Sequence, residues 1–255
     1  MVTDIFLRNN LENSADLFTL AGLFEYIPNI YFFVKNEKSQ FLHVNQNFAK
    51  LLGATQANEV IGKTDHDFFP RYLADEYLKE DLDVMQGTIQ VIEKIWLVAR
   101  SNKQLDWFFS TKLPVFNQKN TTSDFKPSGL IGYIRDCKKS KLGLDQDFVV
   151  KKITDFMLEN YSQHLSVKEL AKMSGLSVSQ MNRRFHQAYQ VGPKQFLLNV
   201  RLKAASHLLV TSDKPITCIV LDTGFFDQSH FSRHFRKTFG MSPNEYRNRY
   251  RGCET

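Results

Sequence analysis

The stretch QSHFSRHFRKTFGMSP, residues 228–243, decides the fold of the C-terminal half of this 255-residue chain. Phe231 and Phe235 lie four residues apart and therefore fall on one edge of a helix. Polar and basic side chains fill the positions between them, so the opposite edge offers hydrogen-bond donors. The stretch predicts an amphipathic helix whose apolar edge packs against its own domain.

The same pattern occurs earlier in the chain, with a constant shift of 50 residues. Ser179 and Arg183 return as Ser229 and Arg233. One copy would be a weak signal, but the repetition indicates two units of the same design. The repeated apolar positions are Met181, Phe185, Tyr189, Val191 and Pro193, which return as Phe231, Phe235, Phe239, Met241 and Pro243. Upstream, Leu170-Ala171 with Gly175 is echoed by Ile219-Val220 with Gly224.

Each unit is predicted to form a helix-turn-helix, which consists of two short helices joined by a tight turn that contains glycine. In the first unit, which follows a predicted helix over residues 148–159, Ser166 and Glu169 form a capping box that starts a short helix. Gly175 ends that helix, and Ser177 caps the next one, over residues 178–189. A long helix over residues 193–211 connects the two units.

The second helix of such a unit enters the major groove of DNA, and a rigid connection would hold the two reading helices about 34 Å apart. Basic side chains elsewhere in the domain suit phosphate contacts, which give affinity without sequence choice. The residues expected to read bases are Ser179, Asn182 and Arg183 in the first unit and Gln228, Ser229, His230, Ser232 and Arg233 in the second. The residues expected at phosphates are Lys168, Arg184, Arg236 and Lys237, with the tail arginines Arg247, Arg249 and Arg251.

Residues 214–225 and 228–243 resemble the signature of AraC/XylS-type transcription regulators, and residues 201–209 are similar to the connecting helix of that family. The resemblance covers about residues 148–251 and implies an all-α double helix-turn-helix domain that binds promoter DNA and contacts RNA polymerase. Two positions depart from the family pattern. Val220 replaces the usual Ala, and Gln190 stands where the first helix usually ends on Gly.

Charge is divided unevenly between the two halves. Residues 1–140 hold 16 Lys/Arg and 17 Asp/Glu, whereas residues 141–255 hold 17 and 10. The excess positive charge therefore lies in the half that carries the repeat, as expected for a module that meets a polyanion.

Several other classes of protein are disfavoured by the sequence. An alkyl-accepting repair enzyme fused to this DNA-binding module would need clustered zinc-binding cysteines in the first half, where only Cys137 occurs, so we expect no enzyme and no catalytic residue. His230 and His234 lack a visible third ligand, so no metal site is expected. No apolar run reaches the roughly 18 residues of a membrane span, and the N-terminus resembles no secretory signal, so we expect a cytoplasmic protein without membrane contact.

The first half predicts an α+β domain built on an antiparallel sheet with flanking helices. Strands are expected over residues 30–35, 41–44, 89–99, 105–115 and 130–135, with helices over 47–52 and 73–86. This order resembles a PAS domain, and the residues that carry the resemblance are 27–36, 44–53, 61–70 and 129–136. The predicted organisation is an N-terminal helical extension over 1–23, a PAS-like sensor or dimerisation domain over 24–137, a linker over 138–147 and the DNA-binding domain over 148–255.

The cup of such a domain can hold a small organic ligand. Expected lining residues are Phe32, Phe33, Phe48, Trp96 and either Phe108 or Phe109, although core packing explains the same aromatic residues equally well. No flavin or haem is expected, because no cysteine or histidine stands where those groups need one. The sequence thus predicts a DNA-binding transcription regulator, expected to be an activator, whose PAS-like domain either senses a signal or ligand or only assembles a homodimer.

Overall fold

The computed structural model describes residues 21–87, 89, 91–100, 105–116, 127–137 and 147–252. The predicted N-terminal extension lies outside the described residues except for residues 21–23, and so does the predicted linker except for Asp147. None of the helices in the described part of the chain is long and apolar enough to cross a membrane.

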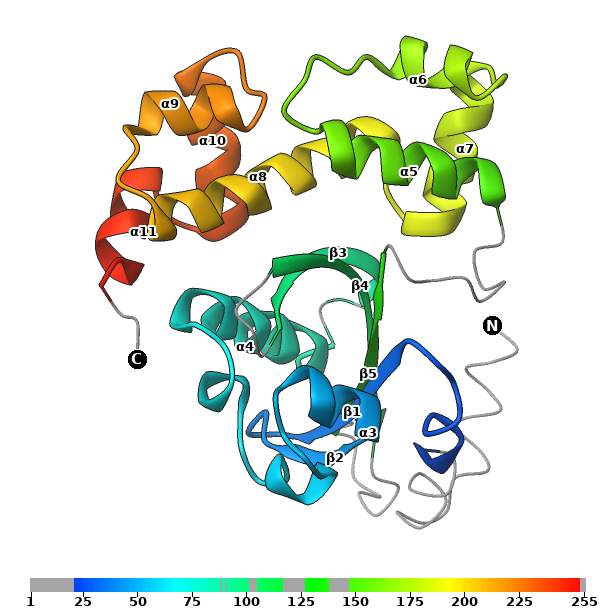
Figure 1. The fold of residues 1–255 in the computed structure, drawn as a ribbon, viewed down its shortest axis with the longest axis vertical. Coiled ribbons are helices and arrows are strands. Elements are labelled where there is room, and N and C mark those ends of the chain that lie inside the picture. Colours follow the sequence, from blue (N-terminus) through cyan, green and yellow to red (C-terminus); the bar gives the residue numbers. More distant parts are fainter. Residues whose placement is uncertain are drawn as a thin grey trace.

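The N-terminal domain is a five-stranded antiparallel sheet in the order β2-β1-β5-β4-β3 (Figure 1). The predicted α+β class is confirmed, and most predicted strands and helices shift by only one to three residues. Its elements are β1 (Ile30–Asn36), β2 (Phe41–Val44), α3 (Gln46–Leu51), α4 (Arg71–Met85), β3 (Val91–Ala99), β4 (Leu105–Phe116) and β5 (Pro127–Asp136), with short 3-10 turns at Ala57–Glu59 and Asp65–Asp67.

Strand β3 forms one edge of the sheet and begins with an irregularity. Its pairing with β4 shifts between Val91 and Lys94, where Glu93 adopts a positive φ of 49°. The carboxylate of Glu93 accepts a hydrogen bond from the Arg135 guanidinium of β5 at 2.9 Å. This bulge bends the start of the edge strand, as bulges commonly do at the rims of sheets.

The C-terminal domain is wholly helical, and its double helix-turn-helix arrangement is confirmed (Figure 1). The side chains of Ser166 and Ser177 accept backbone N–H bonds at the starts of α6 and α7, as their capping boxes predict. The helices are α5 (Phe148–Asn160), α6 (Val167–Met173), α7 (Val178–Tyr189), α8 (Pro193–Thr211), α9 (Ile216–Asp222), α10 (Gln228–Phe239) and α11 (Pro243–Tyr250).

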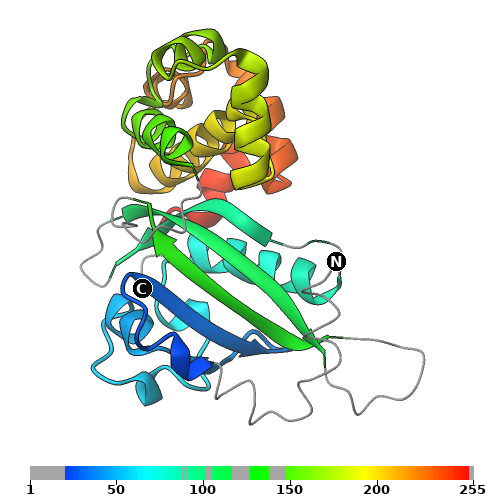
Figure 2. The ribbon, with the colours of Figure 1, turned by 90° about the vertical axis from the view of Figure 1, so that its right-hand side faces the viewer.

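Each helix-turn-helix unit has its own apolar core against one half of α8. Met181 and Phe185 are fully buried with residues of α5 and α6, and Phe231 and Phe235 are fully buried with residues of α9 and α11. The helical domain as a whole sits over the β3 end of the sheet, as Figure 2 shows from the side. The same edge strand therefore borders both domains.

Helices α7 and α10 end in the same backbone conformation with different residues. Gln190 closes α7 in the left-handed region with φ of 58°, and Gly240 closes α10 with φ of 76°. This conformation costs an ordinary residue more than it costs glycine. The unusual Gln190 that the sequence shows at this position therefore carries local strain.

Exchanging these two residue types tests that strain. We expect Gln190→Gly to stabilise the protein by about 1 kcal/mol and Gly240→Ala to destabilise it by about the same amount. A Cβ at Gly240 would meet nothing within 4 Å, so its effect would come from the backbone alone. Thermal unfolding followed by circular dichroism measures both changes, and a lower melting temperature for Gln190→Gly would contradict this explanation.

Candidate functional site

The first candidate reading face lies on α7. Ser179, Asn182 and Arg183 are all exposed, whereas Met181 and Phe185 on the other edge of the helix are buried. The three polar residues follow the i, i+3, i+4 spacing of one helix face. Their side chains can donate and accept hydrogen bonds at base edges without first leaving the protein core.

The second candidate reading face lies on α10, which begins at the N-cap Asp227, whose carboxylate accepts from the His230 backbone N–H at 2.6 Å. Ser232 is half-buried, and the other predicted reading residues of this helix are exposed. Those exposed residues are Gln228, Ser229, His230 and Arg233. The structure thus presents a polar face on each unit. Helices α7 and α10, which carry these faces, lie near opposite ends of α8 (Figure 1).

Positive charge gathers around α10. Partial burial and then the charges of His230, Lys237 and Arg233 lower the pKa of His234. Arg236 and Lys237 are exposed in the last turn of the helix, and Lys168 is exposed on α6 of the other unit. These three predicted phosphate residues are therefore accessible.

The remaining arginines predicted to contact phosphate already have partners within the protein. Arg184 is half-buried and pairs with Asp147 at 3.0 Å, which ties α7 to the start of α5. Arg247 donates to the carbonyls of Leu209 and Lys214 at 3.2 and 2.6 Å. The other two tail arginines, Arg249 and Arg251, lie beside Asp75 and Asp213 respectively. A phosphate would compete with these contacts.

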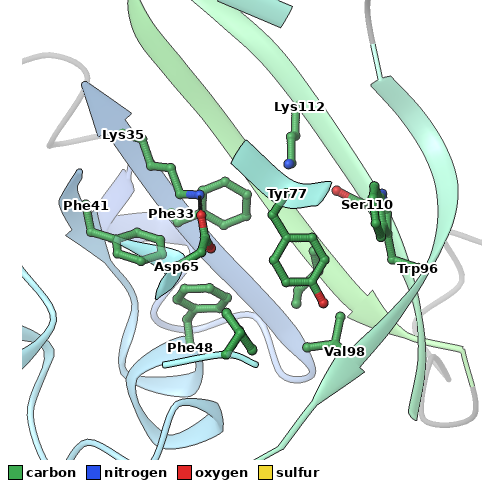
Figure 3. A pocket seen from close by; sticks show the side chains of 12 residues that line it. Phe33, Lys35, Phe41, Phe48, Asp65, Tyr77, Trp96, Val98, Ser110 and Lys112 are labelled. Carbon is green, nitrogen blue, oxygen red and sulfur yellow. Dashed lines mark hydrogen bonds and ion pairs between the residues drawn. The ribbon is translucent and has the colours of Figure 1, made fainter. Parts of the chain in front are cut away.

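The N-terminal domain contains a small cavity of about 30 Å³ between its sheet and its helices (Figure 3). Of the predicted lining residues, Phe33, Phe48 and Trp96 do line it. Phe32 does not, because successive strand residues point to opposite faces and its ring stacks on Phe24 outside the cup, with centroids 4.2 Å apart. Phe108 lies farther along the inner face, where its ring meets Tyr31 with centroids 5.5 Å apart.

A buried ionic network that was not predicted from the sequence lies beside this cavity. Lys35 and Lys112 approach the carboxylate of Asp81 at 2.7 and 2.6 Å, and Lys112 also lies 3.1 Å from Glu80. Lys35 additionally pairs with Asp65. The alternation of each strand could have predicted that both lysines point inward. Lys35 lies two residues after Phe33, and Lys112 lies two residues after Ser110, so each lysine faces the same side as that residue.

Electrostatics within the network differ between its two aspartates. Burial alone would raise the pKa of Asp81, but Lys112 and Lys35 hold it below its usual value. For Asp65, burial outweighs the influence of Lys35, and its pKa is raised. Asp65 is therefore the less stabilised carboxylate of the two, and it lines the cavity.

The second helix-turn-helix unit is bound to the PAS-like domain through α4. Glu76 accepts a hydrogen bond from the Tyr246 hydroxyl at 2.7 Å and pairs with the buried Lys203 of α8. Burial lowers the pKa of His207, so its neutral ring can accept from the Tyr72 hydroxyl at 2.9 Å.

The first unit touches the other face of the sheet. The ring of Phe109 stacks on Tyr189 at the end of α7, with centroids 4.9 Å apart and planes 10° from parallel. Phe109 therefore faces the helical domain and not the cup. Both units of the helical domain are thus held by one sheet and its helix.

Trp96 belongs to the cavity and to the domain interface at once. Its ring lines the cavity, its Nε1 donates to Glu80 at 3.1 Å, and the ammonium of Lys203 lies 3.5 Å from its centroid. A cation at that distance over an indole is attracted by the ring, and more strongly when water is excluded. Any displacement of Trp96 therefore alters the surroundings of α8.

Comparisons with known proteins support the assignment of both domains. A model of the PAS fold matches residues 25–136, and a helix-turn-helix domain model matches residues 170–249. The chain is 30% identical over 118 residues to the transcriptional activator RhaS of Klebsiella pneumoniae, covering 46% of this chain and 42% of that protein. It is 34% identical over 113 residues to the probable transcriptional regulator LumQ of Photobacterium leiognathi, covering 42% of this chain and 46% of that protein.

Among solved structures, the DNA-binding domain of AdpA in complex with a target DNA is 29% identical, and the match covers 41% of this chain and 94% of that one with a TM-score of 0.40. The chain matches less than half the length of RhaS or LumQ. On the sequence matches, the C-terminal domain is a double helix-turn-helix domain of the AraC type. The chain therefore combines a PAS fold with a C-terminal domain that is similar to those of AraC-type regulators.

The pair between Glu76 and Lys203 provides a test of the interface. We expect Glu76→Gln to weaken domain docking by about 3 kcal/mol, because it leaves a buried ammonium without its counter-charge. The exposed pair between Lys214 and Asp222 supplies the matched control, and Asp222→Asn should leave the melting temperature nearly unchanged because solvent screens the pair.

Thermal unfolding of the full chain measures both substitutions. Loss of docking should separate the unfolding of the two domains into distinct transitions in Glu76→Gln, while Asp222→Asn keeps the wild-type profile. Identical profiles for the two variants would show that the buried pair does not hold the domains together.

Proposed function

We propose that the protein is a sequence-specific DNA-binding transcription regulator and that its PAS domain controls how the two helix-turn-helix units meet DNA. The observation that carries this proposal is the pair of exposed polar faces on α7 and α10, each backed by a buried apolar edge. The names of RhaS, an activator, and LumQ, a probable regulator, support the same role and favour activation.

The spacing of the two faces suits one side of DNA. Helix α8 has 19 residues and so spans about 28 Å at the rise of an α-helix. Successive major-groove faces on one side of the duplex lie about 34 Å apart. We propose that Arg183 and Arg233 each read a guanine, the base edge that arginine contacts best, while Lys168, Arg236 and Lys237 hold phosphates.

Control by the PAS domain is supported by its contacts with both units. Phe109 touches the first unit at Tyr189, and Glu76 touches the second at Tyr246. The predicted reading residues remain largely exposed in this docked arrangement. Docking would therefore act on the relative placement of the two reading helices and not by covering them.

The proposed role also suggests partners and a cellular location for the protein. RNA polymerase is the expected partner of an activator, and the cytoplasm is where bacterial-type promoter regulators of this class work. A homodimer formed through the PAS domain would pair two such DNA-binding domains on one promoter. The alternative function is a regulator whose PAS domain only assembles this dimer, and ligand binding by the full chain separates the two possibilities.

The reading faces are tested by Arg183→Ala and Arg233→Ala. Each should reduce discrimination against a substituted base pair in its half of the site by about 1–3 kcal/mol, because a bidentate contact to guanine is lost. Selection of preferred sequences from a random DNA pool, followed by competition binding, measures the change.

Lys79→Ala is the matched control, since Lys79 is an exposed basic residue of α4 in the PAS domain. It should leave both affinity and base preference unchanged. If the double variant of Arg183 and Arg233 selected the same sequences as the wild type, the assignment of the reading faces would be wrong.

A further inference from the structure

The cavity of the PAS domain is lined by the buried hydroxyl of Ser110. The Ser110 side chain is 1% exposed, and its Oγ has no hydrogen-bond partner among the described residues. Its residue lines the cavity together with Lys112, two positions along the same face of β4 (Figure 3). A buried hydroxyl without a partner is costly, so the site is complete only when something accepts or donates a hydrogen bond there.

Lys112 adds a second donor beside Ser110. An ammonium has three N–H groups, and the carboxylates of Asp81 and Glu80 take two of them. The ammonium of Lys35 is less available, because it pairs with two aspartates and also lies 4.7 Å from the centroid of the Phe41 ring. The donors on β4 therefore favour a ligand atom that accepts hydrogen bonds.

The charges around the cavity are already balanced. Three ammonium groups face three carboxylates in one connected network. They belong to Lys35, Lys94 and Lys112 and to Asp65, Glu80 and Asp81. A ligand with a net charge would bring an unpaired charge into a site without bulk water, and that is costly. The raised pKa of Asp65 shows a carboxylate that would gain from one more hydrogen-bond donor.

The rest of the wall is aromatic and apolar. Phe33, Phe48, Tyr77 and Trp96 line it, and such rings pack best against a flat apolar body. These features together point to one class of ligand. We propose that the cup binds a small, flat molecule without net charge that offers an accepting oxygen or nitrogen to Ser110 and Lys112 and an N–H or O–H to Asp65.

Size links this site to the domain interface. A cavity of about 30 Å³ has room for roughly two water molecules. A ligand of the size of one ring therefore fits only when one of the aromatic lining residues moves. Among these residues, Trp96 also contacts the ammonium of Lys203 in α8. Occupancy of the cup would then be felt by the helical domain. This consequence, unlike ligand binding itself, rests on the proposed function.

Three one-ring probes separate the candidate chemistries in the full chain. 2-Pyridone has adjacent N–H and C=O groups and no net charge, benzoate is an anion, and toluene makes no hydrogen bonds. We expect 2-pyridone to raise the melting temperature more than either of the others. In a Trp107→Phe background Trp96 is the sole tryptophan, and 2-pyridone should change its fluorescence in a saturable way.

Two serine variants make the test specific. Ser110→Ala should raise the melting temperature of the free protein, because it removes an unpartnered hydroxyl, and should weaken 2-pyridone binding about three- to tenfold, because it removes a hydrogen bond to the ligand. Ser39→Ala is the matched control, since Ser39 is also buried with an unpartnered Oγ among the described residues but does not line the cavity. It should leave probe affinity unchanged.

Three results would overturn the proposal: no effect of 2-pyridone, equal or greater stabilisation by benzoate or toluene, or wild-type 2-pyridone affinity in Ser110→Ala. Failure here is distinguishable from failure of the DNA-binding proposal. The substitutions at Arg183 and Arg233 change base preference without touching the cup, and probe binding is measured without DNA.

Discussion

The buried ammonium of Lys203 is the contact on which the relation between the two domains depends. It lies on α8 between the indole of Trp96 and the carboxylate of Glu76, both from the PAS domain. Burial lowers the pKa of Lys203, and only nearby acidic groups such as Glu76 offset that effect. A charge held in this way fixes two domains in one arrangement, because moving either domain would leave it unpaired.

The same arrangement would let the PAS domain influence DNA binding, as proposed above, without covering the predicted reading residues. The PAS domain contacts one unit through an aromatic stack and the other through polar bonds to α4, so it bridges both ends of α8. The spacing of α7 and α10 then depends on docking as well as on the stiffness of α8. Trp96 contacts Lys203 at this interface and also lines the cavity. There, among the described residues, the ionic network and the unpaired hydroxyl of Ser110 offer polar groups to a ligand.

Much of the DNA-binding domain could be predicted because its determinants are local. The capping serines, the apolar spacing and the shift of 50 residues define the helices and their exposed faces without knowledge of the rest of the chain. The cup was predicted only in part. Phe33, Phe48 and Trp96 were predicted from their residue type. Phe32 was placed wrongly, because its position depends on which face of the strand points into the cup. The ion pairs of Lys35 with Asp65 and Asp81 join residues 30 and 46 positions apart, so no local pattern predicts them. The domain interface joins distant residues such as Glu76 and Lys203, which lie 127 positions apart, and no local pattern predicts such contacts.

We propose that docking of the PAS domain sets the DNA-binding behaviour of the helical domain. The most direct measurement is the affinity of the full chain for a selected DNA site, compared between the wild type and Glu76→Gln, a substitution outside the predicted reading residues. If docking governs the placement of the reading helices, the affinity should change at least about fivefold, the lower end of typical coupling between sites. An unchanged affinity in a variant whose domains have separated would contradict the claim.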